Sequence, residues 1–418
     1  MVLRLPQGGK QMRKPEILAP AGNLEKLITA INFGADAVYL GGSRLNLRAF
    51  SDNFSIDELK QGLDYAHSRN KKVYVTVNIF AHNEDLIGLE DYLKELYEIG
   101  VDAIIVSDPG IIMTAREVVP NLELHLSTQA NNVNYKSAEF WHKNGVKRIV
   151  LARELSLEEI KELRKKLPDT CELEAFVHGS MCMAYSGRCL LSNYMTGRDS
   201  NRGECAQPCR YKYNIVEEKR PGEFFPIEED ERGTYIFNSK DLCMIEHIPE
   251  LLDTGIDSFK IEGRMKSAFY VASVVKAYRE AVDAYFENPK EYKFNPKWME
   301  YLNRPSHRQY STGFYFGEKD KQIYDSSAYI REYDIVGVVK KYDIENSIAT
   351  IEQKNRVFNG DTVEVLRPVG DSFEVTLNNM KDKNGKDIDA ARTGQMIFTA
   401  ITDKDLMEND ILIKAKEK

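Results

Sequence analysis

One sequence pattern recurs four times before residue 264 and limits the fold more than any other feature. An amphipathic helix ends at a glycine, a short turn follows, and a short apolar strand comes next. The copies lie at 30–42, 96–108, 141–153 and 251–263, and their glycines are Gly34, Gly100, Gly145 and Gly255. Glycine is favoured at the end of a helix because the chain often turns there with positive φ. The strands after the glycines are typical of a parallel sheet that is covered on both faces.

Four further segments, 16–20, 73–78, 122–129 and 172–178, also have the composition of strands, which brings the expected number to eight. Eight strands that alternate with helices favour an α/β fold of the closed (β/α)8 TIM-like barrel type. An open doubly wound sheet is the alternative. No G-x-G-x-x-G motif follows a strand, which counts against a dinucleotide-binding fold.

The chain of 418 residues is long enough for two or three structural units. We expect an N-terminal extension at 1–12, a TIM-like barrel catalytic domain at 13–329 and a C-terminal all-β barrel domain at 330–418. The pattern of helices and strands breaks at 179–241, which we interpret as a cysteine-rich insertion. After residue 330, short strands alternate with turn signals such as the Asn-Gly pairs at 359–360 and 384–385.

The net charge of −8 does not indicate a nucleic-acid partner by itself, and the chain from Ile330 onward has no basic excess. No apolar run approaches the ~18 residues that a membrane-spanning helix needs. The N-terminus lacks the apolar core of a signal peptide. We therefore expect a cytoplasmic protein without a membrane partner.

Polar side chains follow most of the expected strands. In a (β/α)8 barrel the carboxyl ends of the strands surround the active site. The residues at these ends are Asn78, Asp108, Gln129, Arg153, His178, Glu262 and Arg264, with Arg44, Asn46 and Arg48 after the second strand. We call this end of the barrel, formed by the carboxyl ends of the strands, its mouth. A mouth rich in arginines and amides suits a ligand that carries carboxylates, because arginine binds carboxylates in a bidentate manner.

Cysteines give the most specific chemical signal. Cys182, Cys189, Cys205 and Cys209 crowd into the insertion, and Cys243 follows it, whereas Cys171 opens a strand and is expected in the core. Disulfides are disfavoured in a cytosolic chain. Structural zinc prefers closely spaced pairs, and only Cys205 and Cys209 are spaced in that way. Wide spacing suits an iron–sulfur cluster better, with zinc or buried thiols as the alternatives.

Several of these segments resemble a known family. The run from Glu174 to Cys182 and the run from Gly187 to Ser192 resemble the signature of the collagenase-like peptidases of unknown catalytic type. The resemblance extends to 18–22, 36–42, 238–243, 260–267 and 306–315. It covers nearly the whole barrel, and the C-terminal β-domain looks like that of the longer members. In length the chain is most similar to the members that make 5-hydroxyuridine at the tRNA wobble position.

The resemblance implies an enzyme that hydroxylates a tRNA uridine, with a 4Fe–4S cluster as cofactor and prephenate, a small dicarboxylate, as co-substrate. The cysteines that match the cluster ligands are Cys182, Cys189, Cys205 and Cys243, with Cys209 as the alternative fourth ligand. Candidate catalytic residues are His178, Glu262 and Arg264. Candidates for substrate binding are Arg48, Asn78, Gln129, Arg153 and Arg188, and candidates for contact with a tRNA anticodon loop are Arg198, Arg202, Arg210 and Lys212. Whether a second subunit of a related family takes part stays open.

A peptidase is the alternative function, since the family name supports it. The sequence contains no G-x-S-x-G, H-E-x-x-H or P-loop motif. Conventional serine or zinc hydrolysis therefore has no support from the residues. A non-catalytic scaffold or an RNA-binding module is a third alternative.

Overall fold

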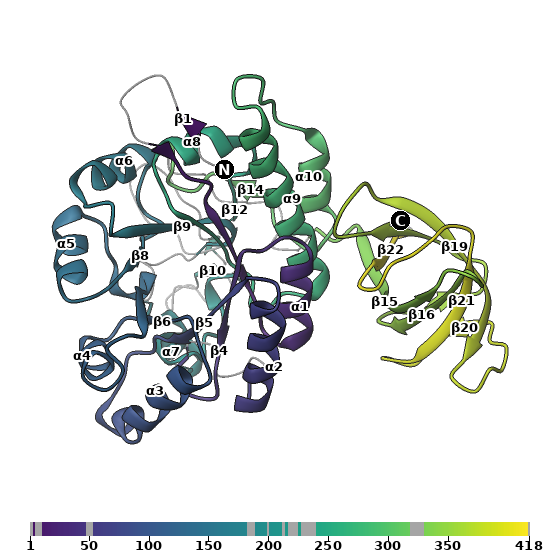
Figure 1. The fold of residues 1–418 in the computed structure, drawn as a ribbon, viewed down its shortest axis with the longest axis horizontal. Helices are drawn as coiled ribbons and strands as arrows, with labels where there is room; N and C mark the ends of the chain where they lie inside the picture. The colour runs from purple at the N-terminus through teal and green to yellow at the C-terminus, as the bar shows by residue number, and fades with distance from the viewer. Residues whose placement is uncertain are drawn as a thin grey trace.

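Eight parallel strands close into a barrel in the computed structural model of the chain (Figure 1). The model describes residues 3–4, 11–46, 53–181, 189–198, 200–210, 214–215, 225–226, 240–317 and 330–416. The barrel strands are β3 (Glu16–Pro20), β4 (Ala37–Gly41), β5 (Lys72–Val77), β6 (Ala103–Val106), β7 (Glu123–Leu126), β8 (Arg148–Val150), β9 (Glu172–Ser180) and β13 (Ser258–Ile261). Because β13 pairs in parallel with both β3 and β9, the ring is closed. The TIM-like barrel is confirmed and the open sheet is excluded.

Helices cover the outside of this barrel (Figure 1). They are α1 (Leu24–Asn32), α2 (Ile56–His67), α3 (Leu89–Glu98), α4 (Pro109–Val118), α5 (Tyr135–Lys143), α6 (Leu157–Lys166), α8 (Ile248–Asp253), α9 (Ala268–Glu287) and α10 (Pro296–Asn303), with short 3-10 turns η1 (Asn83–Leu86) and η5 (Ile245–His247). Gly34, Gly100, Gly145 and Gly255 adopt φ values of 108°, 89°, 88° and 75°, as the sequence pattern predicts. No helix in the described part of the chain is both long and apolar enough to cross a membrane.

Two short strands extend the barrel wall beyond β9, and the sequence did not predict them. β12 (Asp241–Cys243) pairs antiparallel with the end of β9, and β14 (Tyr310–Ser311) pairs in parallel with β12. Between β9 and β12 the structure describes α7 (Leu191–Thr196), η3 (Ser200–Arg202), η4 (Pro208–Arg210) and a two-stranded ribbon of β10 (Asn214–Ile215) with β11 (Phe225–Pro226). At the N-terminus β1 (Leu3–Arg4) pairs with β2 (Gln11–Met12).

The C-terminal part forms a second, antiparallel barrel with its own core. Its closed order is β15 (Tyr333–Asp343), β16 (Ile348–Gln353), β21 (Ile397–Thr402), β19 (Phe373–Asp382), β18 (Thr362–Leu366) and β22 (Ile411–Ala415). A further pair, β17 (Val357–Phe358) with β20 (Ala390–Ala391), lies outside that ring. Alternate residues of each strand point inward, as in Ala349 and Ile351, which are fully buried. The predicted all-β barrel is confirmed.

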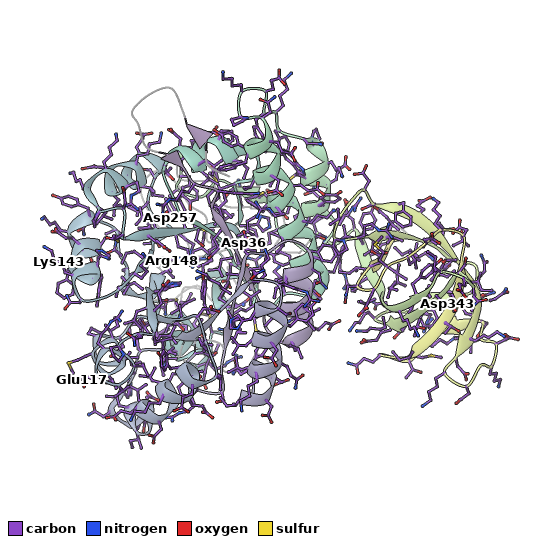
Figure 2. All side chains as sticks on the ribbon, viewed as in Figure 1. Asp36, Glu117, Lys143, Arg148, Asp257 and Asp343 are labelled. Carbon is purple, nitrogen blue, oxygen red and sulfur yellow. The ribbon has the colours of Figure 1, made fainter. Side chains whose placement is uncertain are left out.

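Ion pairs and hydrogen bonds join the two barrels. Arg304 after α10 lies 2.6 Å from Glu364 of β18, and the Lys276 ammonium on α9 donates to the Gly370 carbonyl at 2.9 Å. Figure 2 shows side chains such as Lys143 and Glu117 at the rim of the first barrel, whereas Arg148 lies inside it. Arg148 is 4% exposed, so a charged residue sits in the interior of a folded barrel.

Candidate site at the carboxyl ends of the barrel strands

The segments that carry the family resemblance meet at the carboxyl ends of the barrel strands. A Cβ atom on Gly41 would lie 2.5 Å from Nη2 of Arg264, and one on Gly179 would lie 2.5 Å from the Glu262 carbonyl oxygen. A Cβ on Gly22 would overlap the Arg264 carbonyl. These three glycines, which lie just after β3, at the end of β4 and near the end of β9, therefore leave room for the turn after β13.

Arg264 is the central cation of this mouth. It is 4% exposed. Its Nη1 donates to Thr76 Oγ1 at 3.1 Å, and its Nη2 donates to Asn46 Oδ1 at 3.1 Å. The guanidinium also reaches Asn53 Oδ1 at 3.4 Å. A planar donor with five N–H groups can hold several acceptors in fixed directions, so Arg264 ties the ends of β4, β5 and β13 together.

Glu262 lies in the same turn. The Tyr39 hydroxyl on β4 is 3.1 Å from Glu262 Oε2 and 3.0 Å from the Ile261 carbonyl. The Tyr270 hydroxyl on α9 donates to the Glu262 carbonyl at 3.0 Å. The carboxylate is therefore oriented by Tyr39, and the backbone is fixed by Tyr270.

The ends of β5 and β7 present amides at the mouth. Asn78, at the end of β5, is 8% exposed, and its Nδ2 donates to Ser127 Oγ at 3.0 Å. Its Oδ1 is buried without a hydrogen-bond partner among the described residues. Gln129 lies in η2 (Thr128–Ala130), just after the end of β7, and is also buried. Because buried polar atoms are nearly always paired, the Asn78 oxygen is a natural acceptor for a ligand N–H or O–H group.

Arg153 links this mouth to the cysteine segment. Its Nη1 donates to the Ser180 carbonyl at the end of β9, 2.8 Å away, and its guanidinium stacks over the Phe176 ring at 4.8 Å. Asp108, by contrast, is used by the fold: its carboxylate caps α4 by accepting from the Gly110 and Ile111 amides. Arg44 likewise donates to the carbonyls of Ile87 and Gly88.

His178 is buried in a box of tyrosine rings. It is 1% exposed, and the rings of Tyr270, Tyr278 and Tyr310 lie 6.0, 5.7 and 5.4 Å from its own. Neither ring nitrogen has a hydrogen-bond partner in the described part of the chain. Burial, with smaller effects from Lys266 and His307, lowers the pKa of His178 to about 3. The imidazole is therefore neutral near pH 7, and its catalytic role stays a prediction.

The cysteines divide into partly exposed and buried thiols. Cys189, Cys205 and Cys209 are partly exposed, whereas Cys171 and Cys243 are buried. Cys243 lies on β12 directly opposite His178. Burial raises the pKa of Cys243 to about 12 and that of Cys171 to about 11.

The segment from Cys189 to Cys205 is held together by hydrogen bonds. Ser200 Oγ donates to the Cys189 carbonyl at 2.5 Å, and the Ala206 amide donates to Ser192 Oγ at 2.9 Å. The backbone amide of Gln207 points at the Cys205 sulfur, 3.4 Å away. Amide contacts to sulfur are one of the features that tune cysteine-bound iron–sulfur clusters. The chemistry of these donors therefore fits such a group, although the described residues contain no complete set of three or more metal ligands.

Other predicted residues lie beyond what the structure describes. Arg48, Cys182, Arg188 and Lys212 are outside the described residues, and the side chains of Arg202 and Arg210 are not described either. Arg198 is exposed, just after α7. The proposed RNA contacts and the complete set of cluster ligands thus stay predictions.

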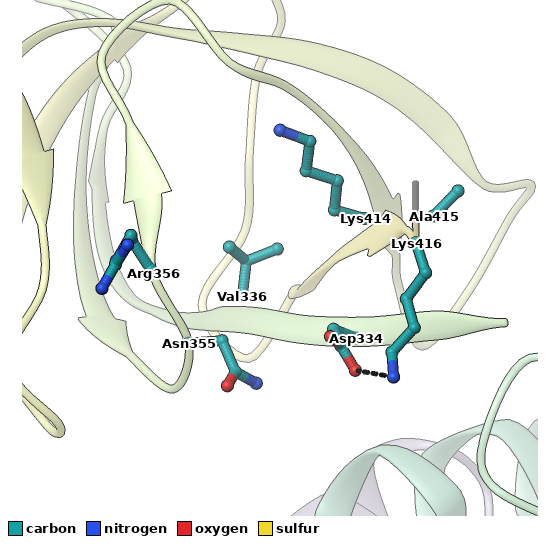
Figure 3. A pocket seen from close by; sticks show the side chains of 7 residues that line it. All are labelled: Asp334, Val336, Asn355, Arg356, Lys414, Ala415 and Lys416. Atoms are coloured by element: carbon teal, nitrogen blue, oxygen red, sulfur yellow. Dashed lines mark ion pairs between the residues drawn. The ribbon is translucent and has the colours of Figure 1, made fainter. Parts of the chain in front are cut away.

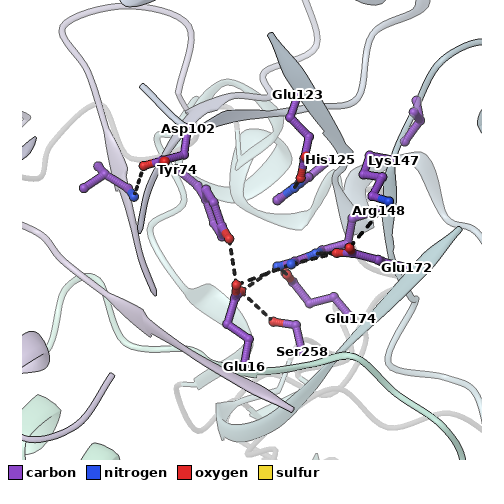
Figure 4. A network of polar contacts seen from close by, with 12 residues as sticks. Glu16, Tyr74, Asp102, Glu123, His125, Lys147, Arg148, Glu172, Glu174 and Ser258 are labelled. Carbon is purple, nitrogen blue, oxygen red and sulfur yellow. Dashed lines mark hydrogen bonds and ion pairs between the residues drawn. The ribbon is translucent and has the colours of Figure 1, made fainter. Parts of the chain in front are cut away.

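The interior of the barrel contains a charged network that sequence reasoning missed (Figure 4). Arg148 lies 2.6 Å from Glu16 and 3.2 Å from Glu174, and Lys260 lies 2.6 Å from Glu174. The Tyr74 hydroxyl donates to Glu16 at 2.7 Å. Burial alone would raise the pKa of Glu174, but Lys260 and Arg148 outweigh it and hold that pKa at about 2. The charged residues within these otherwise apolar strands are the sequence feature from which the network could have been predicted.

Comparisons with known proteins find relatives that match both barrels of the chain. The model described as Peptidase family U32 matches residues 22–325, and the model for the C-terminal domain of that family matches 331–412. The chain is 45% identical over 406 residues to tRNA hydroxylation protein P1 of Bacillus subtilis, covering 97% of this chain and 96% of that protein. It is 39% identical to tRNA hydroxylation protein P of Escherichia coli, covering 90% and 91% of the two chains. A collagenase of Porphyromonas gingivalis is 34% identical and covers 84% of this chain and 86% of its own.

Proposed function

Since the chain belongs to peptidase family U32, we propose that its barrel mouth serves in the hydroxylation of tRNA. The observation that carries this proposal is the 45% identity to a tRNA hydroxylation protein over nearly the full length of both chains. Identity at this level over both barrels supports a shared arrangement of the residues at the mouth and not only a shared fold.

The specific reaction that we propose is formation of 5-hydroxyuridine at the wobble position, with prephenate as the source of the hydroxyl group. Arg153 and Arg264 are cations at the mouth that suit a dicarboxylate, with Arg48 and Arg188 as further candidates. Asn78 Oδ1 is available to accept a hydrogen bond from a substrate. Glu262, held by Tyr39, is the candidate to move a proton there.

We further propose a 4Fe–4S cluster held by Cys182, Cys189, Cys205 and Cys243. When bound, such a cluster supplies a redox or Lewis-acid centre at the mouth. The Gln207 amide, which points at the Cys205 sulfur, would stabilise a thiolate there. Arg153 connects the mouth to this segment through the Ser180 carbonyl.

The tRNA would present a base that has left its stack, because the mouth of a barrel cannot reach a base inside a helix. An anticodon loop offers such bases without the cost of opening a duplex. Arg198, Arg202, Arg210 and Lys212 are the candidates for contacts with its phosphates.

The test is nucleoside analysis of tRNA by mass spectrometry, in cells that lack the gene and in cells complemented with it. We expect 5-hydroxyuridine to disappear and to return with the unaltered gene but not with a Cys205→Ala variant. Unchanged 5-hydroxyuridine in the deletion strain would refute the proposal. The similarity to a collagenase keeps a peptidase as the second candidate. Cleavage of a defined peptide by the purified protein, abolished by a point mutation at the mouth, would favour it.

A further inference from the structure

A pocket on the C-terminal barrel is lined by cationic residues from segments far apart in the sequence (Figure 3). Its volume is about 360 Å³. It lies between the start of β15, the turn from β16 to β17 and the end of β22. The residues that line it are Asp334, Val336, Asn355, Arg356, Lys414, Ala415 and Lys416.

The charge of this pocket is positive although the chain as a whole is acidic. Lys416 lies 3.9 Å from Asp334, which Arg331 already pairs at 2.6 Å. Lys414 pairs with Asp361 at 2.9 Å. The guanidinium of Arg356 is exposed and has no ion pair or hydrogen bond within the described part of the chain. The cations therefore outnumber the carboxylates, and Arg356 is available to an external anion.

The position of the pocket relates it to the candidate site on the first barrel. Lys354, two residues before Arg356, lies 2.7 Å from Glu25 in the first turn of α1. The next residue, Lys26, donates to the Arg264 carbonyl at 3.4 Å. α1 begins where β3 ends, so its first turn lies at the same end of the barrel as Arg264. A short series of contacts therefore runs from the pocket to the mouth.

We propose that this pocket binds a backbone phosphate of the RNA whose base enters the barrel mouth. This inference rests on the proposed function, and it adds the C-terminal barrel to the RNA-binding surface. A guanidinium without a protein partner suits a phosphate, since its N–H groups match two phosphate oxygens. Phosphate contacts position a nucleic acid without reading its sequence. The pocket is thus a positioning site, and the chemistry stays at the mouth.

The test measures binding of a synthetic anticodon stem-loop RNA by fluorescence anisotropy at several salt concentrations. The variants are Arg356→Ala, Lys416→Ala and the double variant, in the full-length protein. Each lost phosphate contact should weaken binding about fivefold at moderate salt and reduce the slope of log affinity against log salt by about 1. Lys383→Ala is the matched control, because Lys383 is an exposed cation in the turn after β19 and does not line the pocket.

The proposal would be overturned if the affinity and the salt slope of the double variant stayed unchanged. It would also be overturned if Lys383→Ala lost as much RNA affinity as the pocket variants. Absence of any RNA binding by the unaltered protein would overturn it too. Competition with inorganic phosphate distinguishes the two possible ligands of the pocket, an RNA backbone phosphate and a free phosphate ion. If phosphate alone binds at Arg356 and stem-loop RNA binds equally well to wild type and variant, the pocket takes a small anion and the proposal is wrong. The nucleoside assay judges the hydroxylation proposal separately, because it requires no contact at Arg356.

Discussion

Nη2 of Arg264, after the last barrel strand, lies 3.1 Å from Oδ1 of Asn46, after the second barrel strand. The two residues are 218 positions apart, and their contact joins opposite ends of the barrel sequence at one point of the mouth. With the bond from Arg264 to Thr76, it fixes the direction of a buried guanidinium. The shape of the mouth therefore depends on a single side chain that presents several donors.

Replacing Arg264 with lysine should impair the reaction much more than it impairs folding. A lysine ammonium keeps the charge but cannot reach Thr76 and Asn46 with the planar geometry of arginine. We expect kcat/KM for 5-hydroxyuridine formation to fall by about 100-fold or more, a loss of about 3 kcal/mol in transition-state stabilisation. The measurement is product formation by the purified, cofactor-loaded enzyme. The control is Arg392→Lys, because Arg392 is exposed and pairs with Asp389 at the protein surface. Equal activity of the two variants would contradict a role for Arg264.

Replacing Arg148 with methionine should destabilise the barrel strongly. Arg148 is buried between Glu16 and Glu174, so its removal leaves Glu16 without the cation that pairs with it and takes from Glu174 one of its two cations, the other being Lys260. Breaking a buried ion pair in this way typically costs about 3–5 kcal/mol. Urea unfolding followed by circular dichroism measures the change. Lys143→Met, which removes an exposed cation from α5, should cost less than about 0.5 kcal/mol. A similar small change for Arg148→Met would show that the network contributes little.

The stability of the protein in acid should depend on Glu174. Its pKa is held at about 2 in the folded protein, below the ordinary value of about 4.3. A carboxyl group with a lowered pKa stabilises the fold at pH values above its ordinary pKa. That contribution is lost as the pH falls from about 5 towards 2. The wild type should therefore exceed Glu174→Gln in stability by roughly 3 kcal/mol near neutral pH, and the difference should shrink below about pH 4. Unfolding free energies measured across this range test it. A difference that does not vary with pH would rule out the titration of Glu174 as the cause.

The barrel was predictable because its signal is local. A helix, a glycine with positive φ and a short apolar strand lie within about a dozen residues, and the structure keeps that order. β12 was not predicted, because a three-residue strand such as Asp241–Cys243 has no periodicity to detect and depends on pairing with β9. The confirmed fold therefore reflects short-range pattern, whereas the added strands depend on long-range contacts.

The candidate site was predictable only in part for the same reason. Position after a strand placed Asn78, Arg153 and Arg264 correctly at the mouth, but it did not distinguish Asp108, whose carboxylate caps a helix. The interior network joins Glu16 to Arg148, 132 residues away, and the pocket on the second barrel joins Arg356 to Lys416. Composition averages over such distances, so the absence of a basic excess after Ile330 did not exclude a local positive pocket.

The cysteines should differ in their effect on bound iron. We expect alanine at Cys182, Cys189, Cys205 or Cys243 to remove most of the iron and acid-labile sulfide from anaerobically purified protein, because a 4Fe–4S cluster is held by four thiolates. Cys209→Ala should keep both. Cys171→Ala serves as the control, since this buried thiol, in the turn just before β9, is expected to lower stability only. If Cys209→Ala loses the iron and Cys243→Ala keeps it, the assignment of the fourth ligand is reversed.

The ion pair between Arg304 and Glu364 should contribute measurably to the attachment of the two barrels. Both side chains are largely buried, their atoms are 2.6 Å apart, and Arg304 also donates to Ser372 at 3.0 Å. A paired and partly desolvated arginine of this kind is worth more than an exposed ion pair, which contributes about 0–1 kcal/mol. A double-mutant cycle with Arg304→Ala and Glu364→Ala isolates the coupling, which we expect to be roughly 1–2 kcal/mol. The cycle is measured by thermal unfolding of the full chain. If the two substitutions are additive, the barrels are held together mainly by other contacts, such as those of Lys276 with the carbonyls of Pro368 and Gly370.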